Sequence, residues 1–315
     1  MPFALLGFVS LGGCAGDAMV LSAPPSATDS GVLPFYSVGS LERGDARRGF
    51  VRVRDTVRIS GDLRFPDGSG PFPAVILAHG CNGNRNVEPV WGPLLRQWGY
   101  ASFNIDSFSG RGLIEVCTGA TSLHPLQRVP DAYGALRLLA AHPRIDPRRV
   151  VLMGFSHGGA LALLASTAWA KDAYAPAGQP SFRAFVSFYP NCNADFPERR
   201  RVSAPVRIHT GELDDWTPAK PCAELAAALK AAGQDVAIDI YPGAHHAFDQ
   251  ARAQIFRAQV NNGSACFPQS VSILGPVAPK SVAGCLKKGA TVAGNPQAAG
   301  AARSKLRAQL AELLN

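Results

Sequence analysis

The fold of this chain is decided by residues 150–166, VVLMGFSHGGALALLAS. The apolar run from Val150 to Phe155 predicts a buried strand, and the run from Ala160 to Ala168 predicts a helix. Between them the pentapeptide GFSHG places Ser156 on a strand-to-helix turn, where the flanking glycines permit the tight backbone approach of a nucleophile elbow. GxSxG also arises by chance in a chain with 32 glycines, and a serine can simply cap a helix. The rest of the chain therefore has to supply a base and an acid.

Short apolar runs alternate with amphipathic stretches on both sides of this segment. The strand-like runs are 73–80, 100–106, 149–155, 182–190, 204–211 and 234–242, and the helical stretches are 87–99, 129–142, 157–170 and 218–233. This alternation predicts an α/β domain with a mostly parallel sheet and helices on both faces. Ahead of it, Phe50–Arg54 and Val57–Phe65 predict an antiparallel N-terminal strand pair. Chemistry is expected at the carboxyl ends of the parallel strands.

A base for Ser156 is expected in one of these loops. His157 is adjacent in sequence, but neighbouring side chains diverge on a tight turn, so we expect it to contribute its backbone N–H instead. The loop YPGAHHAF (241–248) follows a predicted strand and offers His245 and His246. Either histidine has the side chain that general base catalysis needs.

An acid that orients the imidazole is expected in the loop GELDDWTP (211–218). It holds Asp214 and Asp215, and the second also suits the cap of the following helix. A serine, an aspartate and a histidine then follow in the chain order of α/β hydrolases.

The oxyanion hole needs backbone donors near the serine. The turn HGCNG (79–83) follows the first parallel strand, so the N–H of Cys81 is expected to join that of His157. Cys81 as the nucleophile is the competing hypothesis, but this residue lacks an elbow and suits a disulfide better.

With these residues placed, the chain resembles the dienelactone hydrolase family of the α/β-hydrolase superfamily over residues 57–248. The matching motifs are PAVILAHGCNG, GFSHGG, GELDDWTP and YPGAHHAF. The resemblance implies that the triad is Ser156, Asp214 and His246, because the catalytic histidine lies two residues before the phenylalanine and the aspartate three after the glycine. The enzymes that open dienelactone carry a cysteine in the elbow, so the substrate is not inherited with the name.

Substrate contacts are less clearly marked in the sequence. The family's arginine pair for a substrate carboxylate has no clear counterpart here, and Arg111 in the DSFSGRG segment is the candidate, or else a surface cation. Four aromatic residues are expected either to line an apolar acyl pocket or to lie in the core: Phe155, Trp216, Trp91 and Phe108.

The N-terminus and the cysteines predict export. Residues 1–14 resemble a signal peptide that ends in a lipobox, with Cys14 as the lipidated residue, although no lysine or arginine precedes the apolar run. An ordinary buried N-terminal segment is the alternative. Residues 15–46 suggest a flexible Pro/Ser/Gly-rich arm, and 47–315 a single domain whose segment 251–300 is irregular before a closing helix at 301–314. Export predicts a bacterial periplasmic protein or a membrane-anchored lipoprotein.

Six other cysteines remain, with no metal-binding spacing. The sequence favours sequential disulfides: Cys81 with Cys117, Cys192 with Cys222, and Cys266 with Cys285. Six reduced thiols in the core are the alternative.

Composition narrows the function classes further. The 315 residues are 47% hydrophobic and 17% charged, with a net charge of +8. The basic residues are scattered among acidic ones, which argues against nucleic-acid binding. No metal or organic cofactor is implied, and no oligomeric state is predicted. The sequence predicts a serine hydrolase of small carboxylic esters or lactones. The alternatives are a prolyl-oligopeptidase-like peptidase and a non-catalytic tethered binding protein.

Overall fold

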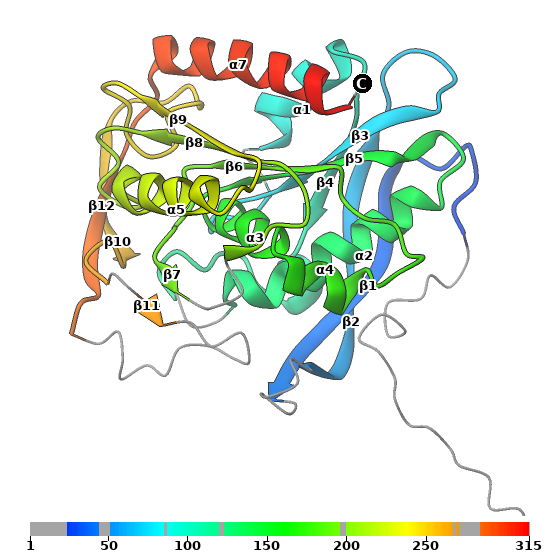
Figure 1. Ribbon diagram of the computed structural model, residues 1–315, viewed down its shortest axis with the longest axis horizontal. Coiled ribbons are helices and arrows are strands. Elements are labelled where there is room, and N and C mark those ends of the chain that lie inside the picture. The colour runs from blue at the N-terminus through cyan, green and yellow to red at the C-terminus, as the bar shows by residue number, and fades with distance from the viewer. Residues whose placement is uncertain are drawn as a thin grey trace, which may run out of the picture.

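An eight-stranded sheet forms the centre of the molecule, as Figure 1 shows. The computed structural model describes residues 24–43, 51–84, 87–119, 123–195, 200–266, 269–270 and 284–314. The strand order is β1-β2-β4-β3-β5-β6-β8-β9. The strands are β1 (Gly31–Arg43), β2 (Val51–Arg64), β3 (Phe72–Ala78), β4 (Ala101–Asp106), β5 (Ile145–Phe155), β6 (Ala184–Phe188), β8 (Val206–Gly211) and β9 (Val236–Tyr241).

The sheet is mostly parallel. All pairs from β4 to β9 run in the same direction, and only β1 with β2 and β2 with β4 are antiparallel. Because parallel strands need crossovers, helices alternate with them. The helices are α1 (Glu88–Gln97), α2 (Val129–Ala140), α3 (His157–Ala165), α4 (Ala168–Tyr174), α5 (Ala219–Ala231) and α7 (Pro296–Leu314), with short 3-10 turns η3 (Ser109–Arg111) and η4 (Pro125–Arg128). The predicted α/β class is confirmed.

The two faces of the sheet carry separate apolar cores. Along β3, Val75 and Leu77 point to the face covered by α1 and α7, whereas Ala74 and Ile76 point to the face covered by α2 to α5. Successive side chains of a strand face opposite sides, so an unbroken apolar run serves both cores. Each fully buried leucine or phenylalanine stabilises the fold by about 1.5–3 kcal/mol. Figure 1 shows the helices divided between these two layers.

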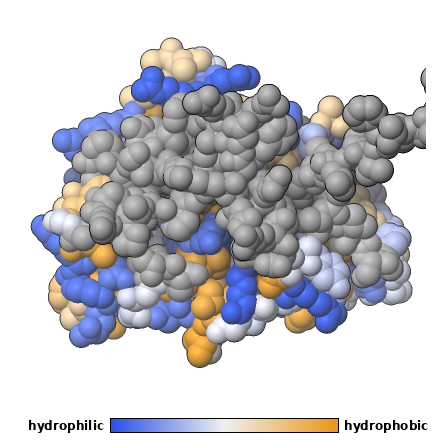
Figure 2. Space-filling view, turned by 90° about the horizontal axis from the view of Figure 1, so that it is seen from below, coloured by the Kyte–Doolittle hydropathy of each residue, from blue (hydrophilic) through white to orange (hydrophobic). Residues whose placement is uncertain are grey.

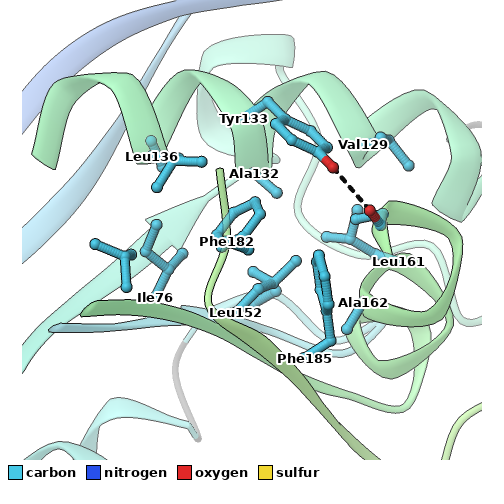
Figure 3. Packing of buried hydrophobic residues seen from close by; sticks show 14 of the residues in the cluster. Ile76, Val129, Ala132, Tyr133, Leu136, Leu152, Leu161, Ala162, Phe182 and Phe185 are labelled. Carbon is cyan, nitrogen blue, oxygen red and sulfur yellow. Dashed lines mark hydrogen bonds between the residues drawn. The ribbon is translucent and has the colours of Figure 1, made fainter. Parts of the chain in front are cut away.

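One polar contact ties the helices of the second layer together. In Figure 3, Tyr133 of α2 lies over Phe182, and its hydroxyl donates to the carbonyl of Ala165 at the end of α3, 2.8 Å away. Tyr133 is almost fully buried, so this bond satisfies a hydroxyl that would otherwise be costly to desolvate. It fixes α3, which begins directly after Ser156, against its neighbour.

The predicted antiparallel N-terminal strand pair is confirmed, but its strands occupy other residues than expected. Residues 31–43 were expected in a flexible arm but form the edge strand β1, and the expected pair Phe50–Arg54 and Val57–Phe65 is one strand, β2. β1 pairs with β2 along its whole length. Phe35 and Ser37 of β1 are buried, so alternation was present beneath the Ser/Gly/Pro composition. Pro34 is compatible with an edge strand because one side of that strand makes no ladder.

The segment after the last parallel strand is also more ordered than predicted. Within residues 251–300, β10 (Ile255–Asn262) pairs antiparallel with β12 (Lys287–Val292) to form a ribbon. β7 (Ala194–Asp195) and β11 (Gln269–Ser270) form a short parallel pair. The closing helix was expected at 301–314 and begins earlier, at Pro296. The predicted helical stretch 157–170 divides into α3 and α4, where Thr167 caps the second helix.

The six described cysteines form the three sequential pairs favoured by the sequence, Cys81–Cys117, Cys192–Cys222 and Cys266–Cys285. Disulfides are typical of proteins outside the reducing cytosol. The predicted signal peptide and Cys14 lie outside the described residues. In the described part of the chain, no helix is both long and apolar enough to cross a membrane. Figure 2 shows hydrophilic and hydrophobic residues interspersed on the visible described surface of one face.

Candidate active site

Ser156 lies on a strained turn between β5 and α3. Its backbone has φ 54° and ψ −113°, a conformation that costs a non-glycine residue about 1–3 kcal/mol. The neighbouring backbone leaves room only for glycine at positions 154 and 158, two residues before and two residues after the serine. A Cβ at Gly154 would lie 1.9 Å from the carbonyl oxygen of Gly158, and one at Gly158 would lie 2.1 Å from that of Ala78. The predicted elbow geometry is therefore present, and it projects the serine from the carboxyl end of β5.

His246 connects Ser156 to Asp214. The Nε2 atom of His246 lies 2.9 Å from Ser156 Oγ, and its Nδ1 atom lies 2.8 Å from Asp214 Oδ2. A carboxylate only accepts hydrogen bonds, so Nδ1 carries a proton and Nε2 is free to accept the serine proton. His246 and Asp214 are both buried, which protects this chain of hydrogen bonds from water. The structure brings together the three residues that the sequence predicts.

The carboxylate of Asp214 is held by its own loop. Its Oδ1 atom accepts the backbone N–H groups of Trp216 (2.9 Å) and Thr217 (2.8 Å). The hydroxyl of Thr217 lies 3.0 Å from both Asp214 Oδ2 and His246 Nδ1, and it donates to the carbonyl of Tyr189. Sequence reasoning missed Thr217. The available signal was the aspartate three residues before it, since an aspartate that accepts backbone N–H groups two and three residues on is a common turn.

The loops after β8 and β9 also bond to each other. The N–H groups of Glu212 and Leu213 donate to the carbonyls of Tyr241 (3.0 Å) and Ala244 (2.9 Å). A Cβ at Gly211 would lie 2.2 Å from the Ala244 carbonyl oxygen, so glycine permits this approach. The two loops form one unit that carries both Asp214 and His246.

Asp215 and His245, the alternatives in these loops, take no part in the hydrogen bonds around Ser156. The carboxylate of Asp215 accepts the N–H (2.8 Å) and hydroxyl (2.9 Å) of Thr291 on β12. The expectation that it caps the next helix is wrong, because the N-cap residue of α5 is Pro218 and no side chain caps this helix. Asp215 instead anchors the β10–β12 ribbon to the acid loop. The Nδ1 atom of His245 is buried and has no hydrogen-bond partner among the described residues.

The turn after β3 lies against the elbow. A Cβ at Gly80 would be only 3.5 Å from the Cβ of Ser156, so the backbone before Cys81 directly adjoins the serine. Cys81 lies along the cavity at Ser156 and is bonded to Cys117, which contradicts its role as a free nucleophile. His157 is the first residue of α3, so its N–H has no carbonyl partner within the helix. These positions suit two oxyanion donors.

The cavity beside Ser156 and His246 is small, about 40 Å³. Two of the predicted aromatic residues, Phe155 and Trp216, line it, together with Tyr189 and Val292. The indole of Trp216 is fixed by a hydrogen bond to the carbonyl of Asn261 on β10 (2.9 Å). The ribbon therefore closes one side of the cavity.

A comparison with known proteins identifies the family. The family model described as the dienelactone hydrolase family matches residues 59–266. This chain belongs to the dienelactone hydrolase family. It is therefore a hydrolase with the α/β-hydrolase fold.

Individual relatives of this dienelactone hydrolase family member are distant. A Bradyrhizobium sp protein described as a probable 2-oxo-3-(5-oxofuran-2-ylidene)propanoate lactonase is 25% identical over 205 residues, 60% of this chain and 78% of its own. The structure of a dienelactone hydrolase-like promiscuous phosphotriesterase from metagenomic libraries matches with TM-score 0.60 and 17% identity, covering 90% of this chain and all of the other. Esterase 2 of Thermogutta terrifontis, phosphonylated by cyclosarin, matches with TM-score 0.50 and 19% identity over 64% of this chain and 83% of its own. Both structures share the fold.

Arg111, the candidate counterpart of the family's substrate-binding arginine, is not at the cavity. Its guanidinium forms two hydrogen bonds with the buried carboxylate of Asp131, at 2.7 and 3.0 Å, and also binds the carbonyls of Ser107 and Val38. The predicted substrate contact is therefore wrong, because this side chain holds η3 and β1 to α2. The alternative of a surface cation is wrong as well, since the arginine is nearly buried.

Trp91 and Phe108 are core residues instead of cavity walls. Trp91 is fully buried against Phe155 and Phe188, and its indole N–H donates to Asp249. Phe108 packs edge-on against His79 at 4.4 Å between ring centres. Trp91 supports the cavity residue Phe155 from behind.

Arg252 and Tyr189 are among the polar residues at the cavity that were not predicted. Arg252 lines it, and its Nε atom has no hydrogen-bond partner in the part of the chain that the structure describes. Tyr189 lines it as well, and its hydroxyl donates to the buried Asp249 (2.8 Å). Burial raises the pKa of the Asp249 carboxyl above its usual range, against the hydrogen bonds from Trp91 and Tyr189. No local pattern marked either residue, because both reach the site through segments without a motif.

Among the residues that the structure describes, no three side chains of histidine, cysteine, aspartate or glutamate are arranged to hold a metal ion.

Proposed function

We propose that this protein is a serine hydrolase that cleaves small carboxylic esters or lactones through an acyl-enzyme. The observation that carries the proposal is the chain of two hydrogen bonds from Ser156 Oγ through His246 to Asp214. Membership of a hydrolase family and the relative described as a lactonase support it.

The proposed reaction uses each group in turn. His246 Nε2 takes the proton of Ser156 as Oγ attacks the carbonyl carbon, and the carbonyl electron pair moves to its oxygen. The N–H groups of Cys81 and His157 bind that oxyanion, and Asp214 stabilises the imidazolium. His246 then protonates the leaving alcohol or alkoxide. Water, activated by the same histidine, releases the acid and restores the serine.

The cavity restricts the acyl group. A volume of about 40 Å³ holds roughly three water-sized groups, so esters with short acyl groups such as acetyl, and small lactones, are the preferred substrates. Arg252 also lines the cavity and adds a preference for substrates that bear an anionic group, because a guanidinium binds carboxylates strongly.

The test is covalent labelling. A fluorophosphonate should label the wild-type protein at Ser156 and leave Ser156→Ala unlabelled, and p-nitrophenyl acetate hydrolysis should fall at least about 10⁴-fold in the variant. Labelling at any other residue, or full activity of Ser156→Ala, would exclude this mechanism. Wild-type protein that neither labels nor turns over a panel of acyl esters and lactones would favour a non-catalytic binding protein.

A peptide library distinguishes the peptidase alternative. A peptidase would cleave it at rates comparable with esters, whereas the small cavity predicts none above background.

We also propose export to the periplasm and a lipid anchor at Cys14, which rest on the N-terminal sequence and on three disulfides. Mass spectrometry of the mature N-terminus tests this. A diacylglyceryl group on Cys14 is expected, and a mature chain that still begins at Met1 would contradict it.

A further inference from the structure

A fully buried arginine, Arg128, lies beside the elbow and contacts His157, the residue after Ser156. Arg128 ends η4 and begins the approach to α2, and its side chain has no exposed surface. Taking a guanidinium out of water costs several kcal/mol, so such a residue is rarely buried without a specific set of partners.

The partners of Arg128 belong to the two loops that flank Ser156. Its Nη1 atom donates to the carbonyl of His79 (3.0 Å), one residue before Gly80 in the turn after β3. The same nitrogen lies 2.8 Å from Nδ1 of His157, the first residue of α3. One nitrogen with two hydrogens thus bridges the two segments that present the N–H groups of Cys81 and His157.

The imidazole of His157 is fixed in one form by these contacts. Its Nε2 atom lies 2.9 Å from the carbonyl of Leu123, which only accepts, so Nε2 carries the proton and Nδ1 accepts from Arg128. Burial and the charge of Arg128 hold the pKa of His157 well below its usual value. Both ring nitrogens are therefore engaged, and the ring is held away from the serine.

Among the residues that the structure describes, none forms a direct ion pair with Arg128. The nearby buried carboxylate of Asp131 is hydrogen-bonded to Arg111 and Ser37. The Nε and Nη2 atoms of Arg128 have no hydrogen-bond partner within the described ranges, and its guanidinium lies 5.2 Å from the centre of the Phe108 ring. Asp131 and Asp106 act on this charge through space, and no hydrogen bond joins either carboxylate to Arg128 within the described ranges.

The two bridged segments touch each other at the point where Arg128 binds. A Cβ at Gly158 would lie 2.6 Å from the His79 carbonyl oxygen, the same atom that accepts from the guanidinium. Moving Arg128 would therefore shift both segments together.

We infer that Arg128 is a positioning residue of the oxyanion hole. By bridging His79 and His157 it fixes the two peptide units whose N–H groups bind the oxyanion, and it places a permanent positive charge behind them. This inference rests on the proposed function. Because Arg128 touches neither the substrate nor Ser156, its contribution appears only where negative charge develops on the carbonyl oxygen.

The experiment compares Arg128→Met with a matched buried arginine. Arg207 is also buried and binds Asp235 and a backbone carbonyl at the opposite end of β8 from Asp214, so Arg207→Met is the control. In Arg128→Met, kcat for p-nitrophenyl acetate should fall about 10- to 100-fold with KM within about twofold, less than the ~10²–10³ that loss of a direct donor costs. In Arg207→Met, kcat should stay within about twofold.

A ketone analogue reports on the oxyanion itself. Ser156 Oγ adds to the carbonyl carbon of trifluoroacetone, its proton passes to His246, and the electron pair rests on the ketone oxygen. The inhibition constant of the ketone should rise in Arg128→Met by the factor by which kcat/KM falls. With ¹³C at the carbonyl, the pKa of the bound hemiketal should rise relative to wild type. A merely structural role would change neither quantity in folded protein.

Two further variants keep the inference testable if Arg128→Met does not fold. Arg128→Lys retains a charge and donors and should recover part of the activity. His157→Leu removes the acceptor but keeps the backbone N–H, and it should weaken ketone binding in the same direction. Folded variants with wild-type kcat and ketone inhibition would overturn the inference. Wild-type protein that forms no hemiketal and hydrolyses no ester would instead contradict the proposed function.

Discussion

Two histidines beside Ser156 have hydrogen-bond partners of opposite charge. His246 has a carboxylate at Nδ1 and the serine at Nε2, whereas His157 has a guanidinium at Nδ1 and a carbonyl at Nε2. The carboxylate stabilises a protonated ring, and the guanidinium stabilises a neutral one. The comparison shows that closeness to the nucleophile in sequence does not make a histidine a base. The hydrogen-bond partners of the two ring nitrogens decide whether a histidine can accept the serine proton.

The partner of His246 provides the largest test of this comparison. Asp214→Asn should lower kcat/KM by about 10³- to 10⁴-fold, because an amide at this position no longer fixes the tautomer with Nε2 free or stabilises the imidazolium. Asp215→Asn is the matched control, since it changes the same group one residue away. Its effect should stay within about fivefold, because that carboxylate binds Thr291. Steady-state hydrolysis of p-nitrophenyl acetate measures both, and a larger loss in Asp215→Asn would reverse the assignment of the acid.

The disulfide beside the cavity provides a test of the proposed oxyanion hole. Removing Cys81–Cys117 by paired alanine substitution should reduce kcat about tenfold, because Cys81 carries a proposed oxyanion donor. Removing Cys266–Cys285 is the control. Both changes open loops of moderate length, with separations of 36 and 19 residues, so both should lower the free energy of unfolding by about 2–4 kcal/mol. Denaturant titration and kcat are measured on each variant. Equal kcat in the two would show that the Cys81 loop is positioned by other contacts.

The parallel layers and the loops of the candidate site could be predicted from the sequence because each follows from local chemistry. Apolar runs identify the strands, and the carboxyl ends of parallel strands meet at one edge whatever the details of packing. Ser156, Asp214 and His246 therefore converge. Choosing between adjacent residues was different. The sequence alone left His245 and His246 open, and only the family motif selected one.

The features that could not be predicted depend on distant contacts. Arg128 looks like any surface arginine in sequence, because its burial follows from the packing of η4 against the His79 turn and α3. The β10–β12 ribbon pairs residues that are about thirty positions apart in the sequence, so no local pattern predicts it. β1 was missed for another reason. Its Ser/Gly/Pro composition hid an alternation that only the pairing with β2 makes stable.

Acid should lower the folding stability through the buried histidines near His157. Burial lowers the pKa of His79 to about 3 and that of His124 to about 4. A lowered pKa in the folded state means that the unfolded chain binds more protons below its own value of about 6.5, so stability is complete above that pH and falls as the pH drops towards 4. His124→Asn keeps an acceptor at the cap of η4, where His124 Nδ1 binds the Leu126 N–H, but it does not titrate. Between pH 7.5 and 5.5 the wild type should lose about 1 kcal/mol more unfolding free energy than this variant. Equal losses in urea titrations would show that His124 is solvated when protonated.

The smallest effect is expected from His245, the neighbour of the proposed base. His245 shares the loop and the side chain of His246, but it makes no hydrogen bond with Ser156 or Asp214, and its Nδ1 is unpaired among the described residues. His245→Ala should therefore keep kcat/KM within about twofold and change stability by no more than about 0.5 kcal/mol. His246→Ala, its matched partner, should lose at least about 10⁴-fold. A large loss in His245→Ala with an unchanged melting temperature would mean that this histidine contacts the substrate. The difference in activity between the two variants would then depend on which ring contacts the bound substrate, in addition to the hydrogen bonds that each ring makes in the free protein.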